Sequence, residues 1–274
     1  MRSTIYIPIL FLGIFISCEE PITIDTDQAP SQIIVEALLT NEMKQHHVKL
    51  TETADFYAVG ETPRISDAMV TVTDNHGNIF DYHEEEPGVY LSTEAFSGVV
   101  GDVYSLSIII GDETFTATEE LLPITTIDSL TFEVFEDDDD DDIELRPGTT
   151  AYEVFLYTIE PQDEDNYYLF KFYRNGIWLN EDGEDITVTD DVAVGEEIEC
   201  IEIPYIYFPG DTARVEMYSL TRQEFIFWSD VASLIFSDGG VFAPLPANPR
   251  SNISGGALGV FQVSALEVGE LIIP

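Results

Sequence analysis

Short runs in which apolar and polar residues alternate recur along this chain, and they limit its fold more than any other feature of the sequence. Every second residue is apolar on both sides of a Gly-Asp turn, at Tyr104, Leu106, Ile108, Ile110, Phe115 and Ala117. A period of two describes a strand with one buried and one solvent-facing side. Because the runs are short and separated by turn residues, they predict an all-β fold built from sandwiches.

A break at Pro123 divides the expected strands into two groups. We expect two β-sandwich-like domains. Residues 32–122 would form an N-terminal domain of the immunoglobulin-like or transthyretin-like kind, and residues 123–274 a second β-rich domain. In the second group, residues 166–174 are aromatic on both faces, which indicates a central strand, and the Asn-Gly pair at 175–176 favours a tight hairpin turn.

One amphipathic helix, residues 221–236, is expected in the second domain. Thr221 and Glu224 have the spacing of a capping box, in which the hydroxyl accepts from a helix amide and the carboxylate accepts from the amide of the capping residue. Apolar residues follow at helical spacing, and Gly239-Gly240 ends the segment. The apolar stripe predicts a helix that packs on a sheet; an aromatic groove for a ligand is the alternative.

The charge of the chain is extreme, with 53 acidic against 10 basic residues and a formal net charge of -43. Binding to a phosphate backbone needs Lys and Arg to displace counterions, so nucleic acid is excluded as a partner. The 13 Tyr and 17 Phe do not fit a disordered chain. The charge must therefore lie on the solvent-facing side of a folded protein.

The amino terminus has the features of a bacterial lipoprotein signal. An apolar run, Ile5–Ile16, is too short to span a bilayer comfortably and stops just before Cys18. We therefore expect residues 1–17 to be a signal peptide, Cys18 to carry a palmitate-type lipid anchor, and residues 18–31 to tether the fold to the membrane. An ordinary secretory signal and a membrane anchor left in place are the alternatives.

The second cysteine, Cys200, then has no disulfide partner in the mature chain. It lies in an alternating segment, Ile198–Ile203, which predicts a buried and inert thiol. A catalytic cysteine needs a neighbouring base and an electropositive setting, and so acidic a chain with four histidines offers little of either.

Two acidic segments are candidates for a calcium site, because calcium takes clustered oxygen ligands. Six consecutive aspartates, Asp137–Asp142, lack the alternating ligands and the turning glycine of a calcium loop, which favours a solvated loop. A later Asn-Glu-Asp-Gly-Glu-Asp segment contains a glycine that permits a tight turn. Its Asp182, Glu184 and Asp185 are the better metal candidates, with a plain hairpin turn as the alternative. The four histidines form no zinc signature.

The sequence contains no nucleophile elbow, no phosphate-binding glycine loop and no cysteine pair. Carboxylate pairs are too common in so acidic a chain to identify a glycosidase. We therefore expect a protein that is not an enzyme and that needs no cofactor apart from the calcium considered above. A hydrolase with an unrecognised carboxylate pair is the alternative.

Several segments resemble an uncharacterised family of Bacteroidota outer-membrane lipoproteins, domain of unknown function 4249. They are Cys18-Glu-Glu, Ile33–Asn41, Ile65–Asp74, Pro87–Tyr90, the junction Pro123–Leu130 and the C-terminal segment Phe242–Phe261. The most specific part ends in Ser251-Asn-Ile-Ser-Gly-Gly256. The resemblance covers nearly the whole mature chain, and the acidic run from Glu136 to Asp142 departs from it as an insertion.

The resemblance implies an accessory role in nutrient uptake, because members of this family are commonly found beside TonB-dependent outer-membrane transporters. Glu19 and Glu20 resemble the surface-export signal of Bacteroidota lipoproteins, which implies a lipid-anchored protein of the outer membrane that faces the cell surface. The family has no established catalytic residues, so none is carried over. Two short segments also resemble the O-glycosylation motif of these bacteria, which makes Ser129 and Thr212 candidate acceptors.

The C-terminal glycines, Gly255, Gly256 and Gly259, allow close backbone approach or positive φ, and Asn252 can cap a turn through its side chain. We expect a turn that locks the last strand onto the sheet, with a ligand contact as the alternative. The expected function is a binding or accessory component, in particular of a TonB-dependent transport system. The alternative function is a calcium-assisted adhesin or glycan-binding module.

Overall fold

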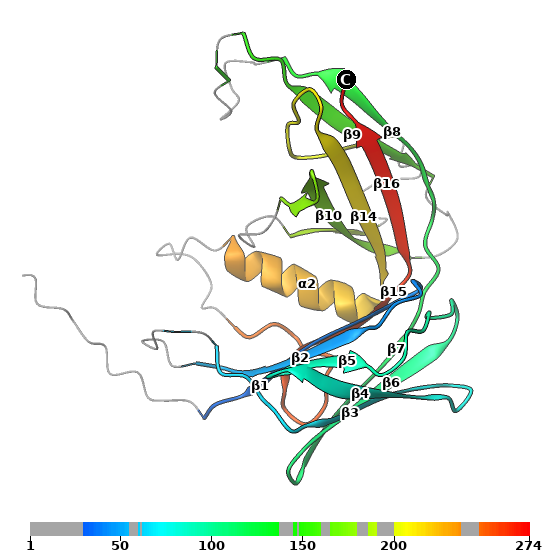
Figure 1. Cartoon of the computed structure of the whole chain (residues 1–274), viewed down its shortest axis with the longest axis vertical. Helices are drawn as coiled ribbons and strands as arrows, with labels where there is room; N and C mark the ends of the chain where they lie inside the picture. Colours follow the sequence, from blue (N-terminus) through cyan, green and yellow to red (C-terminus); the bar gives the residue numbers. More distant parts are fainter. Residues whose placement is uncertain are drawn as a thin grey trace, which may run out of the picture. The chain divides into compact units, whose positions relative to one another are not determined.

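A computed structural model describes residues 30–54, 60, 62–136, 145–146, 148–159, 165–179, 186–190, 200–236 and 247–274. Strands dominate this part of the chain, and a single helix accompanies them (Figure 1). The predicted all-β fold with one helix is confirmed. Within the described ranges, no helix is both long enough and apolar enough to cross a membrane.

The first sheet has eight strands in the order β15-β1-β2-β5-β4-β3-β6-β7. Their bounds are β1 Ile33–Thr40, β2 His47–Glu52, β3 Met69–Asp74, β4 Ile79–Glu86, β5 Val89–Ser92, β6 Val103–Ile110, β7 Glu113–Glu120 and β15 Leu258–Ser264. Neighbours are antiparallel except β1 and β15, which run parallel with Val35 opposite Gly259. The inward side chains form the first core, which includes Leu50, Val72 and Leu106.

Two smaller sheets follow. The second contains β11 Ile177–Trp178, β10 Tyr167–Arg174, β14 Thr212–Leu220 and β16 Leu266–Ile272, with β12 Thr187–Asp190 also paired to β10; the third contains β13 Ile201–Glu202, β9 Tyr152–Thr158 and β8 Ile127–Val134. Phe170 and Phe172 of β10 enter a second core with Val154 of β9 and Met217 of β14. The predicted turn after β10 is present, since Asn175 and Gly176 have φ values of 53° and 79°, as a two-residue hairpin requires.

The helix α2, Arg222–Ile235, has Thr221 as its N-cap and Phe236 as its C-cap, so its predicted bounds are confirmed. Phe225 and Trp228 of its apolar stripe pack against a small third core that contains Leu169 and Tyr218. The stripe therefore serves packing on a sheet, as expected from its width.

The C-terminal strands depart from the expected division at residue 122. Although β15 comes late in the chain, it lies beside β1 in the first sheet, and Ile253 and Ala257 just before it belong to the first core. The next strand, β16, pairs with β14 in the second sheet. Residues 31–274 accordingly form one compact unit. Alternation in a segment identifies its two faces but not the strand beside which it lies, so the sequence did not reveal this crossing.

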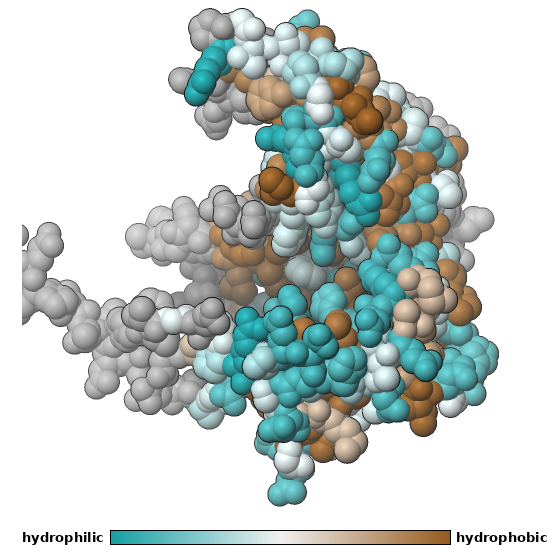
Figure 2. Space-filling model, in the orientation of Figure 1, coloured by the Kyte–Doolittle hydropathy of each residue, from teal (hydrophilic) through white to brown (hydrophobic). Residues whose placement is uncertain are grey.

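The surface agrees with the acidic composition. Figure 2 shows hydrophilic side chains over much of the visible face, interrupted by separate apolar patches. Apolar side chains at the surface are normal for a folded protein.

Candidate functional site

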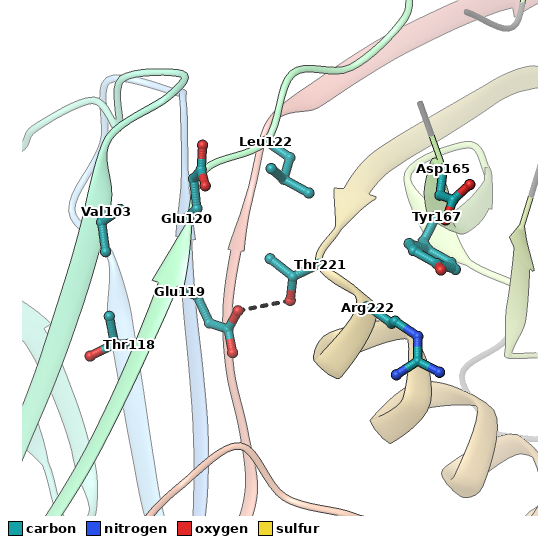
Figure 3. Close-up of a pocket in the computed structure, with 9 residues that line it drawn as sticks. All are labelled: Val103, Thr118, Glu119, Glu120, Leu122, Asp165, Tyr167, Thr221 and Arg222. Carbon is teal, nitrogen blue, oxygen red and sulfur yellow. Dashed lines mark hydrogen bonds between the residues drawn. The ribbon is translucent and has the colours of Figure 1, made fainter. Parts of the chain in front are cut away.

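The start of α2, where Figure 3 draws Thr221, meets strands from distant parts of the chain. Thr221 and Glu224 make the connection. The Thr221 hydroxyl accepts from the Glu224 amide at 3.4 Å, and the Thr221 amide donates to Oε2 of Glu224 at 2.8 Å. The other carboxylate oxygen of Glu224 accepts from the Val263 amide on β15 at 2.6 Å. The predicted capping box is confirmed, and it also ties the helix to the edge of the first sheet.

Glu119 on β7 is the second carboxylate of this junction. The Thr221 hydroxyl donates to Oε2 of Glu119 at 2.8 Å, the bond drawn in Figure 3. The Asn252 side-chain amide donates to Oε1 of Glu119 at 2.7 Å. Strand β7 and strand β15 are the two edges of the first sheet, so these bonds hold its two edges and the helix together.

The Asn252 side chain bonds to the free edge of β15, as the backbone of a neighbouring strand would. Its Oδ1 accepts from the Phe261 amide at 2.9 Å, and its Nδ2 donates to the Phe261 carbonyl at 2.8 Å. Nearby, the Ser251 hydroxyl donates to the Gly259 carbonyl at 2.8 Å. An open strand edge exposes unpaired backbone groups, and these side chains satisfy them.

Gly259 explains why β15 lies so close to β1. Its φ is 99°, and a Cβ built there would lie 1.9 Å from the Val35 carbonyl oxygen. Only glycine fits such a position. The predicted locking turn is present, but it holds β15 and not the last strand, which is β16. The segment most specific to the family resemblance is thus a structural lock.

Both carboxyl groups of the junction are shielded from water, since Glu224 is 0% exposed and Glu119 is 6% exposed. Burial raises the pKa of Glu119, although Asn252 and Thr221 donate hydrogen bonds to it. Burial and the neighbouring Glu119 charge raise the pKa of Glu224 well above its ordinary value, against the two backbone amides that favour its ionised form. Because protein donors bond to the oxygens of both groups, the pair holds elements together.

A pocket of about 440 Å³ lies beside this junction. Its lining, drawn in Figure 3, consists of Val103, Thr118, Glu119, Glu120, Leu122, Asp165, Tyr167, Thr221 and Arg222. The Tyr167 ring is held by Phe225 of α2, with ring centroids 4.7 Å apart. Charges of both signs beside a fixed aromatic ring suit a polar ligand that both donates and accepts hydrogen bonds, such as a sugar or a peptide segment.

The predicted anchor and calcium residues lie outside the described part of the chain: Cys18, Glu19, Glu20, Asp182, Glu184, Asp185 and the run Asp137–Asp142. Where the structure does describe side chains, no group of three or more His, Cys, Asp or Glu is placed to hold a metal ion. The lipid anchor, the export signal and the calcium site stay predictions.

The two candidate glycosylation sites both lie on strands. Ser129 is exposed on β8, whereas the half-buried Thr212 is the first residue of β14 and donates its amide to Oδ1 of Asn175 at 2.9 Å. Ser129 therefore offers the more accessible hydroxyl. Glycosylation of either residue stays a prediction.

The predicted burial of Cys200 is wrong, because this residue is exposed directly before β13. Strand β13 is a two-residue edge strand, and the buried positions of its segment reach Ile203 but not Cys200. Among the histidines, His46 is buried beside the Phe96 carbonyl, and burial lowers its pKa to about 4. A neutral histidine in the core explains its placement without a ligand role.

Glu119 was not identified from the sequence, although a signal was present. Alternate residues of β7 point to the same side of the sheet, and these include Phe115, Ala117 and Glu119. The alternation that buries the two apolar side chains therefore also buries the acid. A buried carboxyl group needs hydrogen-bond partners. Its partners, Asn252 and Thr221, are far away in sequence and only the fold brings them close.

Comparison with known proteins gives a family and distant structural likenesses. A two fibronectin type-III domain segment from chicken tenascin is 11% identical with a TM-score of 0.20, and covers 69% of this chain and 90% of that chain. A DUF4785 family protein from Legionella pneumophila is 6% identical with a TM-score of 0.22, and covers 68% of this chain and 52% of that chain. No curated protein matches the chain. The family described as Domain of unknown function (DUF4249) matches residues 19–267, and the chain therefore belongs to this family.

Proposed function

We propose that this chain is a lipid-anchored protein of a bacterial outer membrane, facing the cell surface, and that it serves a TonB-dependent transport system as a binding or accessory component. In this proposal it is not an enzyme. It binds the transporter, the transported substrate, or both.

Membership of the DUF4249 family is the observation that carries the proposal, and the position of the match supports the anchor. The match begins at residue 19, directly behind Cys18. The apolar run Ile5–Ile16 lies before it, as in a lipoprotein leader. The shared part of the family thus starts where a mature lipoprotein would start, and the resemblance to Bacteroidota lipoproteins supports the same membrane.

Charge and chain length support the same arrangement. A net charge of -43 repels anionic headgroups, so a chain that stays at a membrane needs a covalent anchor. Strand β1 begins at Ile33, and an extended chain from Cys18 to that point reaches about 50 Å at most. This reach keeps the fold near the mouth of a neighbouring transporter, and the polar pocket beside Thr221 supplies a surface for a ligand.

The experiment is a detergent pull-down of the tagged, lipidated chain from its native outer membrane, with mass spectrometry of the recovered proteins. We expect a TonB-dependent barrel in near-equimolar amount. A Cys18→Ser chain, which lacks the lipid acceptor, is the matched control and should recover much less of it. A lipidated chain recovered without any barrel would contradict the accessory role and favour a free-standing surface binder.

A further inference from the structure

Lys171 is an unusual residue in this chain, which has only three lysines among 53 acidic residues. It lies on β10 between Phe170 and Phe172, which face the second core, so its own side chain leaves the opposite face of the sheet. Its cross-strand partner on β14 is Glu216. An acid directly opposite a lysine is normally its ion-pair partner.

Glu216 does not form that ion pair, because other groups occupy it. Its Oε2 accepts from the Tyr173 hydroxyl at 2.9 Å and from the Tyr218 hydroxyl at 2.7 Å. Its Oε1 accepts from Nη2 of Arg214 at 2.9 Å. The carboxylate opposite Lys171 is thus bound by two phenols and by an arginine that also pairs with Glu270 at 2.7 Å, and it makes no direct ion pair with the lysine.

The Lys171 ammonium instead lies between two aromatic rings. Its Nζ is 5.3 Å from the centre of the Trp178 ring and 5.1 Å from the centre of the Tyr218 ring. Among the described residues it has no hydrogen bond and no ion pair. Ring faces attract a cation but do not neutralise it, so the charge keeps its capacity for an anion.

The two other lysines of the chain also act on Lys171. Burial lowers the pKa of Lys171, and the nearby Lys44 and Lys49 lower it further against the effect of Glu216. Lys44 is paired with Glu42 at 2.5 Å and Lys49 with Glu36 at 3.6 Å, so the local acids already have partners. Among the described residues, Lys171 is the one lysine of the three without an ion pair of its own.

Trp178 gives this charge an accessible apolar neighbour. It lies on the edge strand β11, and 36% of its surface is exposed. A half-exposed indole beside a cation presents a flat apolar surface and a positive charge to the same ligand.

We propose that Lys171, Trp178 and Tyr218 form a binding site for a small carboxylate carried on a ring. The carboxylate pairs with the Lys171 ammonium, and the ring stacks on Trp178. This inference names a ligand class for the binding component proposed above and rests on that proposal. Its test uses the purified chain alone, so a failure here leaves the pull-down result untouched, and a failed pull-down leaves this site untouched.

The test is calorimetric titration of the full mature chain with glucuronate and with 4-hydroxybenzoate, two ring carboxylates. Glucose and acetate serve as the neutral ring and the ringless anion. We expect at least one ring carboxylate to bind, and Lys171→Met to weaken it about tenfold or more, because an ion-paired hydrogen bond is lost. Lys49→Met, at a lysine that already has Glu36, is the matched control and should change affinity less than about threefold.

A melting curve of Lys171→Met separates binding from folding. Lys171→Met keeps the apolar stem and loses only the ring contacts of the ammonium, so the melting temperature should fall by a few degrees at most, while binding is lost. The proposal is overturned if neither ring carboxylate binds, if glucose or acetate binds equally well, or if Lys171→Met binds like the unaltered chain.

Discussion

At the scale of single residues, Asn252 joins the C-terminal segment to both β15 and β7. A side-chain amide both donates and accepts, so it can pair with a peptide group as another strand would. Asn252 does this with both backbone groups of Phe261 and still donates to Glu119. The parallel strand β15 thereby has partners on both of its edges.

Replacing Asn252 with leucine should destabilise the protein by about 2–4 kcal/mol, because the Phe261 amide and carbonyl and the Glu119 carboxyl all lose partners in a buried place. Urea unfolding of the variant measures the change. Asn248→Leu, at an exposed position before the same segment, is the control and should cost less than about 0.5 kcal/mol. Equal losses in both variants would show that Asn252 does not hold the edge.

Two glycines of the C-terminal segment make a matched pair. Both have positive φ, but a Cβ on Gly256 meets nothing within 4 Å, whereas one on Gly259 meets the Val35 carbonyl. Gly256→Ala should therefore cost about 1–2 kcal/mol for its backbone conformation alone. Gly259→Ala should cost clearly more or prevent folding, and urea unfolding with soluble yield tests this. A Gly259→Ala chain as stable as Gly256→Ala would contradict the close approach of β15 to β1.

The residue scale also shows what a sequence can reveal. Glycines at tight positions and a capping Thr are visible because the backbone demands them locally. The role of Asn252 is not visible, because its partner Glu119 is brought to it only by folding. Cys200 shows a different kind of error. The alternation of its segment predicts a strand, but it does not determine how deeply each side chain is buried.

At the scale of elements, α2 is joined to the first sheet through two acidic residues, and only one of them belongs to the helix. The capping box requires Glu224, but β7 supplies Glu119 and β15 supplies the Val263 amide. Burial of both carboxyl groups makes this attachment sensitive to pH, because a buried carboxyl group favours its protonated form.

The pH dependence has a definite sign. The pKa of Glu119 is raised above 4.5 in the folded chain, so the unfolded chain loses this proton first as the pH rises. The stability from the protonated group is fully present below pH 4.5 and is lost as the pH rises through the folded pKa. Glutamine does not ionise, so Glu119→Gln does not lose this stability as the pH rises. The free energy of unfolding of the variant, relative to the unaltered chain, should therefore increase between about pH 4 and pH 8.

Urea unfolding at both ends of that range measures the gain. Glu120→Gln is the matched control, because the Glu120 side chain is exposed on the same strand and faces water in both states. A Glu119→Gln chain whose stability difference does not change with pH would contradict the assigned shift.

Elements were predictable to different degrees for a physical reason. The helix and the hairpin after β10 depend on neighbouring residues, so caps, turns and periodicity identify them. The position of β15 depends on its pairing with Ile34–Thr40, at the other end of the chain. Such pairing is decided by packing and not by local sequence.

At the scale of the whole molecule, consecutive strands β15 and β16 belong to different sheets and connect the two larger cores. The first core contains Ile253, Phe261 and Val263, which come from the far end of the chain. The first half of the sequence therefore lacks part of its own core.

A fragment of residues 31–122 should accordingly fail to form a stable fold, because the edge of β1 and the buried side chains of β1 and β7 lose their cover. Near-ultraviolet circular dichroism and resistance to protease measure this. The full mature chain is the control. A fragment that unfolds cooperatively, with a melting temperature near that of the full chain, would restore the division at residue 122.

A lipid on Cys18, near the amino terminus, would make this protein a membrane-anchored binder. The measurement is the intact mass of the protein purified from its native membrane. We expect a chain that begins at Cys18 and carries a diacylglyceryl lipid, and glycosylation at Ser129 or Thr212 would add the mass of sugar units. A bare polypeptide, or one that begins at another residue, would contradict it.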